Sequence, residues 1–152
     1  MNKPELKTYL EQTFPGCKVE ETFDFPLLWV DKNNIIATAD KLKYSAETNF
    51  DFLFCETAVD MVNHFELVYH LSSTKFHHNM VMKVVIEDMD NSKIESVNYL
   101  WQAAEFFENE IFDMFGIRFI NHPNLRRIML GDEWPGFPLR KDYNDDVNII
   151  RI

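Results

Sequence analysis

Glycine and cysteine are scarce in this chain, which has four glycines and two cysteines among 152 residues. The glycines, at positions 16, 116, 131 and 136, lack the spacing of a backbone cradle for nucleotide phosphates. Cys17 and Cys55 stand alone, so they supply too few ligands for an iron–sulfur cluster or a structural zinc site. The scarcity therefore excludes a Rossmann or P-loop site and a cysteine-bound metal.

Long apolar runs and an excess of basic residues are also missing. No apolar stretch approaches the roughly 20 residues of a membrane-spanning helix, and no apolar signal segment follows Met1. We therefore expect no direct membrane insertion and a reducing cytoplasmic setting. The formal net charge is −10, with 15 Lys and Arg against 25 Asp and Glu. Since nucleic-acid binding needs a cationic surface, DNA and RNA are excluded as partners.

Arginine is absent from the first 117 residues, which carry nine lysines and 20 acids. All five arginines lie in residues 118–152, together with Lys141 and five acids. Three of the six prolines and three of the four glycines also follow residue 115. Because arginine favours paired, desolvated sites and proline breaks helices, we predict an acidic domain over residues 1–116 and an extended interface segment over residues 117–152. We call residues 117–152 the C-terminal arm.

The domain before the C-terminal arm is predicted to be α+β. Helical spacing and Pro4 near a helix start predict a short helix ending near Phe14, and Leu27–Val30 is typical of a strand. Residues 50–59 also show helical spacing, which predicts a second helix. Alternating residues over 65–71 and 80–86 predict two strands of an antiparallel hairpin. The expected architecture is two layers, a small mixed or antiparallel sheet packed by helices.

Residues 96–115 are predicted to form a long helix, capped by Ser96 and ended by a left-handed Gly116. Glu108 falls inside its apolar arc, so it should be buried and should need a cation or several N–H donors. The arginines of the C-terminal arm are its expected partners. A second apolar patch around Phe106 and Tyr99 lies on the other side of the helix. That patch indicates either cover by the chain's own arm or a docking face for another protein.

Three other kinds of site were weighed. Glu108, Glu110 and Asp113 do not converge on one point from a single helix, which disfavours a catalytic or metal-binding carboxylate cluster. His77 and His78 are adjacent and lack zinc-ligand spacing, so a solvated hairpin turn is favoured. No serine has the flanking glycines of a nucleophile elbow, and nothing recommends hydrolysis.

The densest pattern lies in residues 113–142, which read DMFGIRFINHPNLRRIMLGDEWPGFPLRKD. With Glu108-Asn109-Glu110 it resembles the signature of the 30-kDa subunit family. Members of this family are the C subunit of proton-pumping NADH:quinone oxidoreductase (respiratory complex I) and the J subunit of the photosynthetic NDH complex. The resemblance extends from about residue 27 to residue 143. Two positions depart from it: Asn109 replaces a basic residue, and Phe137 stands where histidine is common.

This resemblance implies a cofactor-free subunit of the peripheral domain of the complex, with FMN and iron–sulfur clusters held by partner subunits. It implies packing on the D subunit, whose walls help form the quinone site, and near the iron–sulfur B subunit and other peripheral subunits. The whole complex couples NADH oxidation by quinone to proton translocation, whereas the isolated subunit would not be catalytic. The implied location is the cytoplasmic face of the bacterial inner membrane.

Roles for the signature residues follow from the same resemblance. Glu108 would form a buried ion pair within the C-terminal arm, while Glu110 and Asp113 would hold this arm or the partner. The basic residues Arg126, Arg127, Arg140 and Lys141 would meet partner carboxylates or backbone carbonyls. The remaining signature positions, which include the expected turns, are Gly116, His122, Pro123, Pro138, Leu139 and Asp142.

Three rival functions remain open at this point. The nearest is the equivalent subunit of a related membrane complex, an energy-converting hydrogenase or a ferredoxin- or F420-linked quinone reductase. Another is a free-standing enzyme that uses the carboxylates of the long helix. The third is a soluble adaptor unconnected with membranes.

Overall fold

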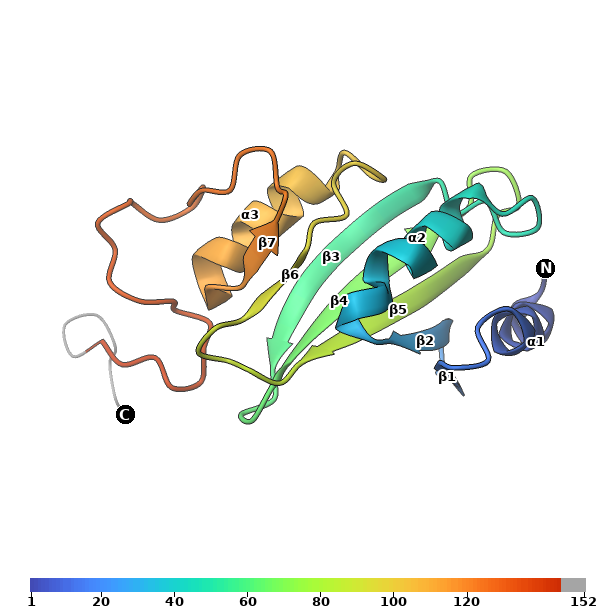
Figure 1. Ribbon diagram of the computed structural model, residues 1–152, viewed down its shortest axis with the longest axis horizontal. Helices are drawn as coiled ribbons and strands as arrows, with labels where there is room; N and C mark the ends of the chain where they lie inside the picture. The colour runs from blue at the N-terminus through green and yellow to red at the C-terminus, as the bar shows by residue number, and fades with distance from the viewer. Residues whose placement is uncertain (146–152) are drawn as a thin grey trace.

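A five-stranded mixed sheet forms the centre of the molecule. The computed structural model describes residues 1–145; the end of the predicted C-terminal arm, residues 146–152 with Arg151, lies outside the described residues. The strands follow the order β1-β2-β5-β4-β3. They are β1 (Lys18–Glu21), β2 (Pro26–Val30), β3 (Phe52–Asp60), β4 (Phe65–Ser72) and β5 (Asn79–Ile86). The predicted hairpin is confirmed as β4 and β5, which pair antiparallel, while β2 runs parallel to β5 (Figure 1).

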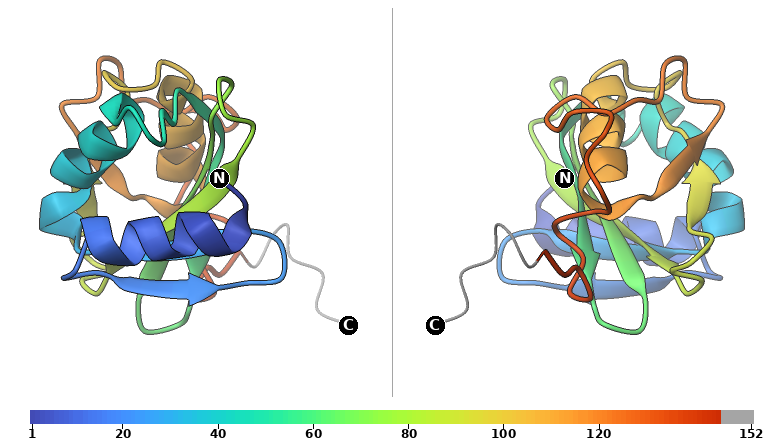
Figure 2. Two further views of the ribbon diagram at one scale, coloured as in Figure 1. Left: turned by 90° about the vertical axis from the view of Figure 1, so that its right-hand side faces the viewer. Right: turned by 90° about the vertical axis from the view of Figure 1, so that its left-hand side faces the viewer.

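Three α-helices pack on one face of this sheet: α1 (Lys3–Thr13), α2 (Ile35–Tyr44) and α3 (Ala104–Phe115). The larger of two buried clusters joins side chains of all three helices with alternate residues of the strands. Figure 2 shows the helices and the sheet that enclose it from two further sides. The predicted first helix is confirmed, and Asn2 and Glu5 form a capping box at its start. A short 3₁₀ turn (Lys32–Asn34) and α2 follow β2; the sequence reasoning did not predict either. The α+β class is confirmed.

Strand β3 occupies the segment for which a helix was predicted, so that prediction is wrong. A β-bulge between Leu53 and Cys55 interrupts the pairing with β4. The extra residue shifts the alternation of buried side chains, and the shifted pattern imitates helical spacing. The buried residues on either side of the bulge, Leu53 and Glu56, lie three apart for this reason.

The long helix predicted from Ser96 begins only at Ala104, although it ends as predicted at Gly116, whose φ is 75°. Residues 97–101 form turns instead, in which Leu100 and Trp101 both donate to the Val97 carbonyl. Ser96 caps no α-helix: its hydroxyl donates to Glu108 and accepts from the Asn98 N–H within the turn. The tertiary contact with Glu108 therefore overrides the local helical pattern.

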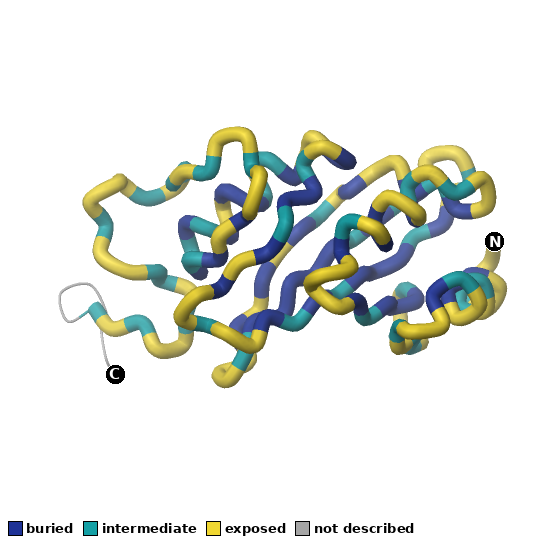
Figure 3. Tube along the Cα trace, viewed as in Figure 1, coloured by how far each residue is buried: buried dark blue, intermediate teal, exposed yellow. Residues whose placement is uncertain are grey.

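The C-terminal arm starts as a strand. Strand β7 (Arg118–Ile120) pairs parallel with β6 (Lys93–Glu95), and the described residues beyond it form turns and bends. The chain loops out past α3 and returns to the turn between β3 and β4 (Figure 1), and most of the loop is exposed or half-buried (Figure 3). Within residues 1–145, no helix has the length and apolar character needed to cross a membrane.

Candidate functional site

Helix α3 carries three polar side chains that are completely or almost completely buried. The exposed fractions are 0% for Glu108, 1% for Asn109 and 0% for Asp113. Burial of Glu108 follows the prediction from the apolar arc. Asn109 and Asp113 are buried because the C-terminal arm covers the other side of the helix. The two sides of α3 thus face different environments, the sheet and the arm.

Asp113 binds the middle of the C-terminal arm through hydrogen bonds. Its Oδ2 accepts hydrogen bonds from three consecutive backbone N–H groups, those of residues 128, 129 and 130, at 3.1, 2.8 and 3.0 Å. Its Oδ1 accepts from the Arg127 guanidinium at 2.8 Å. Burial disfavours the charged carboxylate, but these donors outweigh burial and hold the pKa of Asp113 below its usual value. A charged Asp113 therefore fixes this loop to α3.

Arg127 extends the same network toward the next turn of the arm. One of its terminal nitrogens also donates to the Asp113 carbonyl at 3.1 Å, and the other donates to the carbonyls of Trp134 and Gly136 at 3.2 and 2.9 Å. Its guanidinium lies over the Phe137 ring, 5.1 Å from the centroid. The expected carbonyl and carboxylate partners of Arg127 are therefore groups of its own chain.

Glu108 faces the sheet and meets no arginine of the described chain, which corrects the expected pairing. Its carboxylate accepts from the Ser96 hydroxyl at 2.6 Å and from the Val97 backbone N–H at 2.8 Å. The side chain of the C-terminal arm that approaches it is His122, whose Nε2 lies 3.7 Å away. Arginines do not reach Glu108 because the arm crosses α3 on the Asp113 side.

His122 makes two hydrogen bonds to backbone groups through its two ring nitrogens. Its Nδ1 accepts from the backbone N–H of Asn124 at 3.0 Å, so that nitrogen carries no proton. Its Nε2 donates to the Glu105 carbonyl at 3.0 Å. His122 therefore fixes the turn that begins the arm loop through these backbone groups, and its Nε2 lies farther from Glu108, at 3.7 Å.

A second buried carboxyl group, Glu56 on β3, lies on the sheet beneath α3. It stands opposite Tyr69 in the β3–β4 register, and neither its oxygens nor the Tyr69 hydroxyl has a hydrogen-bond partner among the described residues. Burial, and then the nearby Glu108, raise the pKa of Glu56 well above the ordinary value. Burial also raises the pKa of Glu108, to about 7, against the lowering effect of its donors from Ser96 and Val97. The nearby Tyr69 hydroxyl opposes the rise in the pKa of Glu56, but its effect is smaller than those of burial and of Glu108.

Asn109 and Phe137, the two departures from the family pattern, both have structural roles. The Asn109 amide oxygen accepts from the Arg126 backbone N–H at 2.9 Å, while the Arg126 side chain is exposed. The Phe137 ring lies against Gly116, where an added Cβ would come within 2.5 Å of a ring carbon. A neutral amide and a flat ring thus fill positions on the inner side of the arm.

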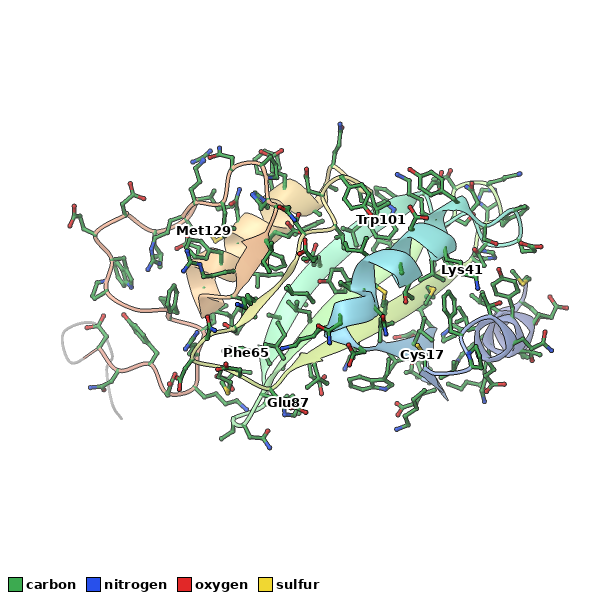
Figure 4. All side chains as sticks on the ribbon, viewed as in Figure 1. Cys17, Lys41, Phe65, Glu87, Trp101 and Met129 are labelled. Carbon is green, nitrogen blue, oxygen red and sulfur yellow. The ribbon has the colours of Figure 1, made fainter. Side chains whose placement is uncertain are left out.

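Arg140 and Lys141 hold the return of the arm to the sheet. The Arg140 guanidinium donates to the carbonyls of Phe115 and Met89, at 2.5 and 3.2 Å. It also lies over the rings of Phe65 and Phe137, 5.1 and 5.2 Å from their centroids, and Figure 4 labels Phe65 at this end of the sheet. The backbone N–H of Lys141 donates to Asp60 at 2.8 Å, and its side chain is exposed.

The other signature residues form the turns and the outer surface. The Arg140 N–H donates to the Phe137 carbonyl at 3.2 Å, which closes a turn with Pro138 at its second position. The Leu139 N–H donates to the Met114 carbonyl at 3.1 Å, so the backbone is fixed while the side chain remains 54% exposed. The exposed signature residues whose side chains make no hydrogen bond to another described residue are Glu110, Pro123 and Asp142.

Several residues of this network were not predicted. Ser96 was expected to cap a helix, Glu56 lies in a segment expected to be helical, and Asp60 follows directly after that segment. Their polar character inside an apolar stretch was the only available signal, because each contacts residues distant in sequence. Within residues 1–145, no group of three or more His, Cys, Asp or Glu residues is placed to hold a metal ion.

The fold and these contacts define a small α+β protein whose long C-terminal segment is fixed on its inner side by buried polar groups. The family model for "Respiratory-chain NADH dehydrogenase, 30 Kd subunit" matches residues 28–147. The chain therefore belongs to the family of the 30-kDa subunit of respiratory-chain NADH dehydrogenase.

Two relatives illustrate how the family is built. The C subunit of NADH-quinone oxidoreductase from Moorella thermoacetica is 38% identical over 136 residues, which cover 88% of this chain and 90% of the relative. The C/D subunit of NADH-quinone oxidoreductase from Phocaeicola vulgatus is 39% identical over 114 residues, 74% of this chain. The chain spans about a fifth of the length of the C/D relatives that it matches.

A solved structure shares the fold. It is a chain of the membrane-bound sulfane sulfur reductase, described as an archaeal respiratory membrane complex, and it superimposes with a TM-score of 0.77 at 24% identity. The match covers 95% of this chain and 86% of the other. At this identity the likeness concerns the fold alone.

Proposed function

We propose that this chain is the C subunit of a proton-pumping NADH:quinone oxidoreductase and that its C-terminal arm attaches it to the D subunit, near the B subunit. Membership of the family supports the assignment of the chain to this complex. The joined names of the C/D relatives support the contact with the D subunit. The chain lies on the cytoplasmic face of the bacterial inner membrane, on the peripheral part of the complex. NADH oxidation, quinone reduction and proton translocation take place in other subunits.

The observation that carries the attachment is the contrast between the two sides of the C-terminal arm. Its inner side is fixed by Asp113 and by the guanidinium groups of Arg127 and Arg140. Its outer side leaves Met129 61% exposed and Leu139 54% exposed. A loop that is rigidly held and apolar on its outside loses little conformational entropy when a partner covers it. We assign Met129 and Leu139 to the contact with the D subunit.

The attachment is tested with the double substitution Met129→Glu and Leu139→Glu in cells that assemble the complex. Both side chains are exposed, so the chain should fold as before, while two charges should prevent an apolar contact. We expect loss of the D subunit from material purified through this chain. Tyr44→Glu is the matched control, because Tyr44 is 65% exposed on α2, away from the arm. A double variant that still retains the D subunit would contradict the proposal.

Catalysis by the isolated chain is tested separately. We expect the purified chain to contain no stoichiometric flavin, iron or zinc and to oxidise no NADH. Metal analysis, absorbance spectra and an NADH oxidation assay measure this directly. A bound cofactor or turnover that Glu110→Gln abolishes would favour the free-standing enzyme instead.

The second candidate is the equivalent subunit of a related membrane complex. A chain of the archaeal sulfane sulfur reductase has the same fold. The fold alone therefore does not distinguish a subunit of NADH:quinone oxidoreductase from the equivalent subunit of a related complex. Mass spectrometry of the co-purifying proteins distinguishes them. NADH-oxidising proteins support the first candidate, and hydrogenase, ferredoxin-linked or F420-linked proteins support the second. A chain found wholly in the cytosol, without partners, would support the soluble adaptor.

A further inference from the structure

The outer face of β3 and the turn after it expose five large hydrophobic side chains within eleven residues. They are Phe52, Phe54, Val59, Met61 and Val62, with exposed fractions of 49, 37, 41, 44 and 71%. We call these five side chains the β3 strip. Between them, Leu53 and Ala58 point to the other face of β3 and are buried in the core beneath the helices. The strip therefore lies on the side of the sheet that α1, α2 and α3 leave uncovered.

Strand β3 is also an edge strand without the usual protection. Edge strands of proteins that act alone commonly carry lysine, proline or charged side chains that prevent pairing with other chains. The sequence of β3, FLFCETAVD, has no lysine, arginine or proline, and its two acids, Glu56 and Asp60, are both 4% exposed. Its protection in the described chain is the bulge next to Leu53.

The opposite edge of the same sheet provides an internal comparison. Strand β1 is only four residues long and reads KVEE. Three of its four side chains are charged: Lys18, Glu20 and Glu21. One edge is thus protected by length and charge, whereas the other is long and apolar on its outer face. This asymmetry indicates that the β3 edge is covered in the working protein.

The carboxylate that borders the β3 strip opposite Val59 is paired within the chain. Glu66 stands opposite Val59 in the register, and its carboxylate pairs with Lys83 at 2.9 Å and lies 3.5 Å from His64. A partner that covers Val59 therefore has no unpaired carboxylate to desolvate there. An apolar surface of a partner can therefore cover this part of the β3 strip without burying an unpaired charge.

The charge of the chain argues against a second copy as the partner. Each copy carries a formal charge of −10, and all of the excess acid lies before the C-terminal arm. Two such bodies repel each other, so the complementary surface is neutral or basic.

The β3 strip is joined to the C-terminal arm near Lys141. Asp60 accepts from the Val62 N–H through Oδ1 at 2.7 Å and from the Lys141 N–H through Oδ2 at 2.8 Å. One buried carboxylate thus joins the turn of the strip to the arm that we assign to the D contact. A partner seated on the arm is positioned to continue over the strip.

We propose that the β3 strip is a second docking surface, covered by a subunit of the same complex whose contact surface is apolar and carries no net negative charge. This inference rests on the proposed function, because it takes the chain to be part of a multi-subunit complex. The inference goes beyond the proposed function because it assigns the uncovered face of the sheet, and not only the C-terminal arm, to contacts within the complex.

Site-specific photocrosslinking in cells that assemble the complex tests the proposal. A photoreactive amino acid replaces Phe52 or Val59 in the strip, Met129 in the arm, or Lys18 on the protected edge. We expect crosslinks from Phe52 and Val59 to a subunit of the complex, identified by mass spectrometry, and none from Lys18. Crosslinks from the strip to a second copy of this chain, or to no other member of the complex, would overturn the proposal.

The Met129 position separates this proposal from the proposed function. Crosslinks from Met129 but not from the strip would overturn the second surface and leave the attachment of the arm intact. Absence of crosslinks from all these positions to members of the complex would overturn the proposed function itself.

A charge substitution adds a quantitative test. Val59→Lys places a charge on the strip at an exposed position, and Lys18→Glu is the matched control on the protected edge. We expect at least about tenfold less co-purified complex with Val59→Lys, since an unpaired charge in an apolar contact costs more than the ~1.4 kcal/mol that tenfold in affinity represents. The thermal transition of the purified chain should not change. Unchanged co-purification would contradict the proposal.

Discussion

The Phe137 ring occupies the space that a side chain at Gly116 would need, within 2.5 Å of the position of its Cβ. Gly116 also has a φ of 75°, in the left-handed region that a residue with a Cβ adopts only at a cost. The end of α3 and the return of the C-terminal arm are therefore packed against each other through one glycine and one aromatic ring. The arm closes on the helix because position 116 has no side chain.

The first prediction concerns this contact. Gly116→Ala should lower the free energy of unfolding by about 2 kcal/mol or more, because it adds overpacking to backbone strain. Phe137→Ala should be destabilising alone but should reduce the cost of Gly116→Ala when the two are combined. Urea denaturation of the four chains measures the coupling. Strictly additive effects would show that the ring and the glycine do not interact.

The second prediction concerns the negative charge of Asp113. Asp113→Asn should lower the free energy of unfolding by about 3 kcal/mol, because it leaves the Arg127 guanidinium and three backbone N–H groups without a charged acceptor. Hydrogen exchange of residues 128–130 should accelerate in the same variant. Glu110→Gln is the control: Glu110 is exposed on the same helix, and its loss should change stability by less than about 0.5 kcal/mol.

The third prediction is a pH dependence that comes from the buried pair Glu56 and Glu108. The pKa of Glu108 is raised from 4.5 to about 7, so between these values the folded chain binds a proton that the unfolded chain has lost. The free energy of unfolding should therefore fall as the pH rises from 5 through about 7, with Glu108 alone contributing a slope of up to ~1.4 kcal/mol per pH unit and Glu56 adding to it. Glu56 has its pKa raised well above its ordinary value and extends this fall to higher pH.

The control for that titration is the double variant Glu56→Gln and Glu108→Gln. It should remove the decline in stability between pH 5 and 7 measured by urea denaturation. Asp113 does not interfere, because its pKa is lowered and its contribution is lost only at more acidic pH. A decline of the same slope in the double variant would assign the effect to other groups.

The fourth prediction concerns the end of the arm. Arg140→Lys keeps the charge but loses the planar fork that donates to two carbonyls and lies between two rings, so it should cost about 1 kcal/mol or more of stability. Amide exchange of residues 139–143 should accelerate. Arg126→Lys, at an exposed guanidinium, should leave exchange there unchanged. Equal exchange in both variants would mean that Arg140 does not hold the arm.

Helix α1, strand β2 and the β4–β5 hairpin were predictable because hydrophobic periodicity and local caps specify them. Strand β3 was not, because its bulge breaks the alternation, and the start of α3 was not, because Glu108 draws Ser96 and Val97 into a different contact. Part of the site followed from the sequence as well, since the burial of Glu108 and the left-handed Gly116 were predictable. The partner of Glu108 was not.

The sequence by itself determined the division between a lysine-bearing acidic body and an arginine-bearing C-terminal segment, and the motif that places the chain in its family. Only the tertiary structure decided that Asp113, not Glu108, pairs with arginine. It also decided that the guanidinium groups of Arg127 and Arg140 donate hydrogen bonds to carbonyls of their own chain. It also decided which apolar side chains remain uncovered on β3. Composition and spacing record which groups are present, whereas the partner of each group depends on where distant segments cross.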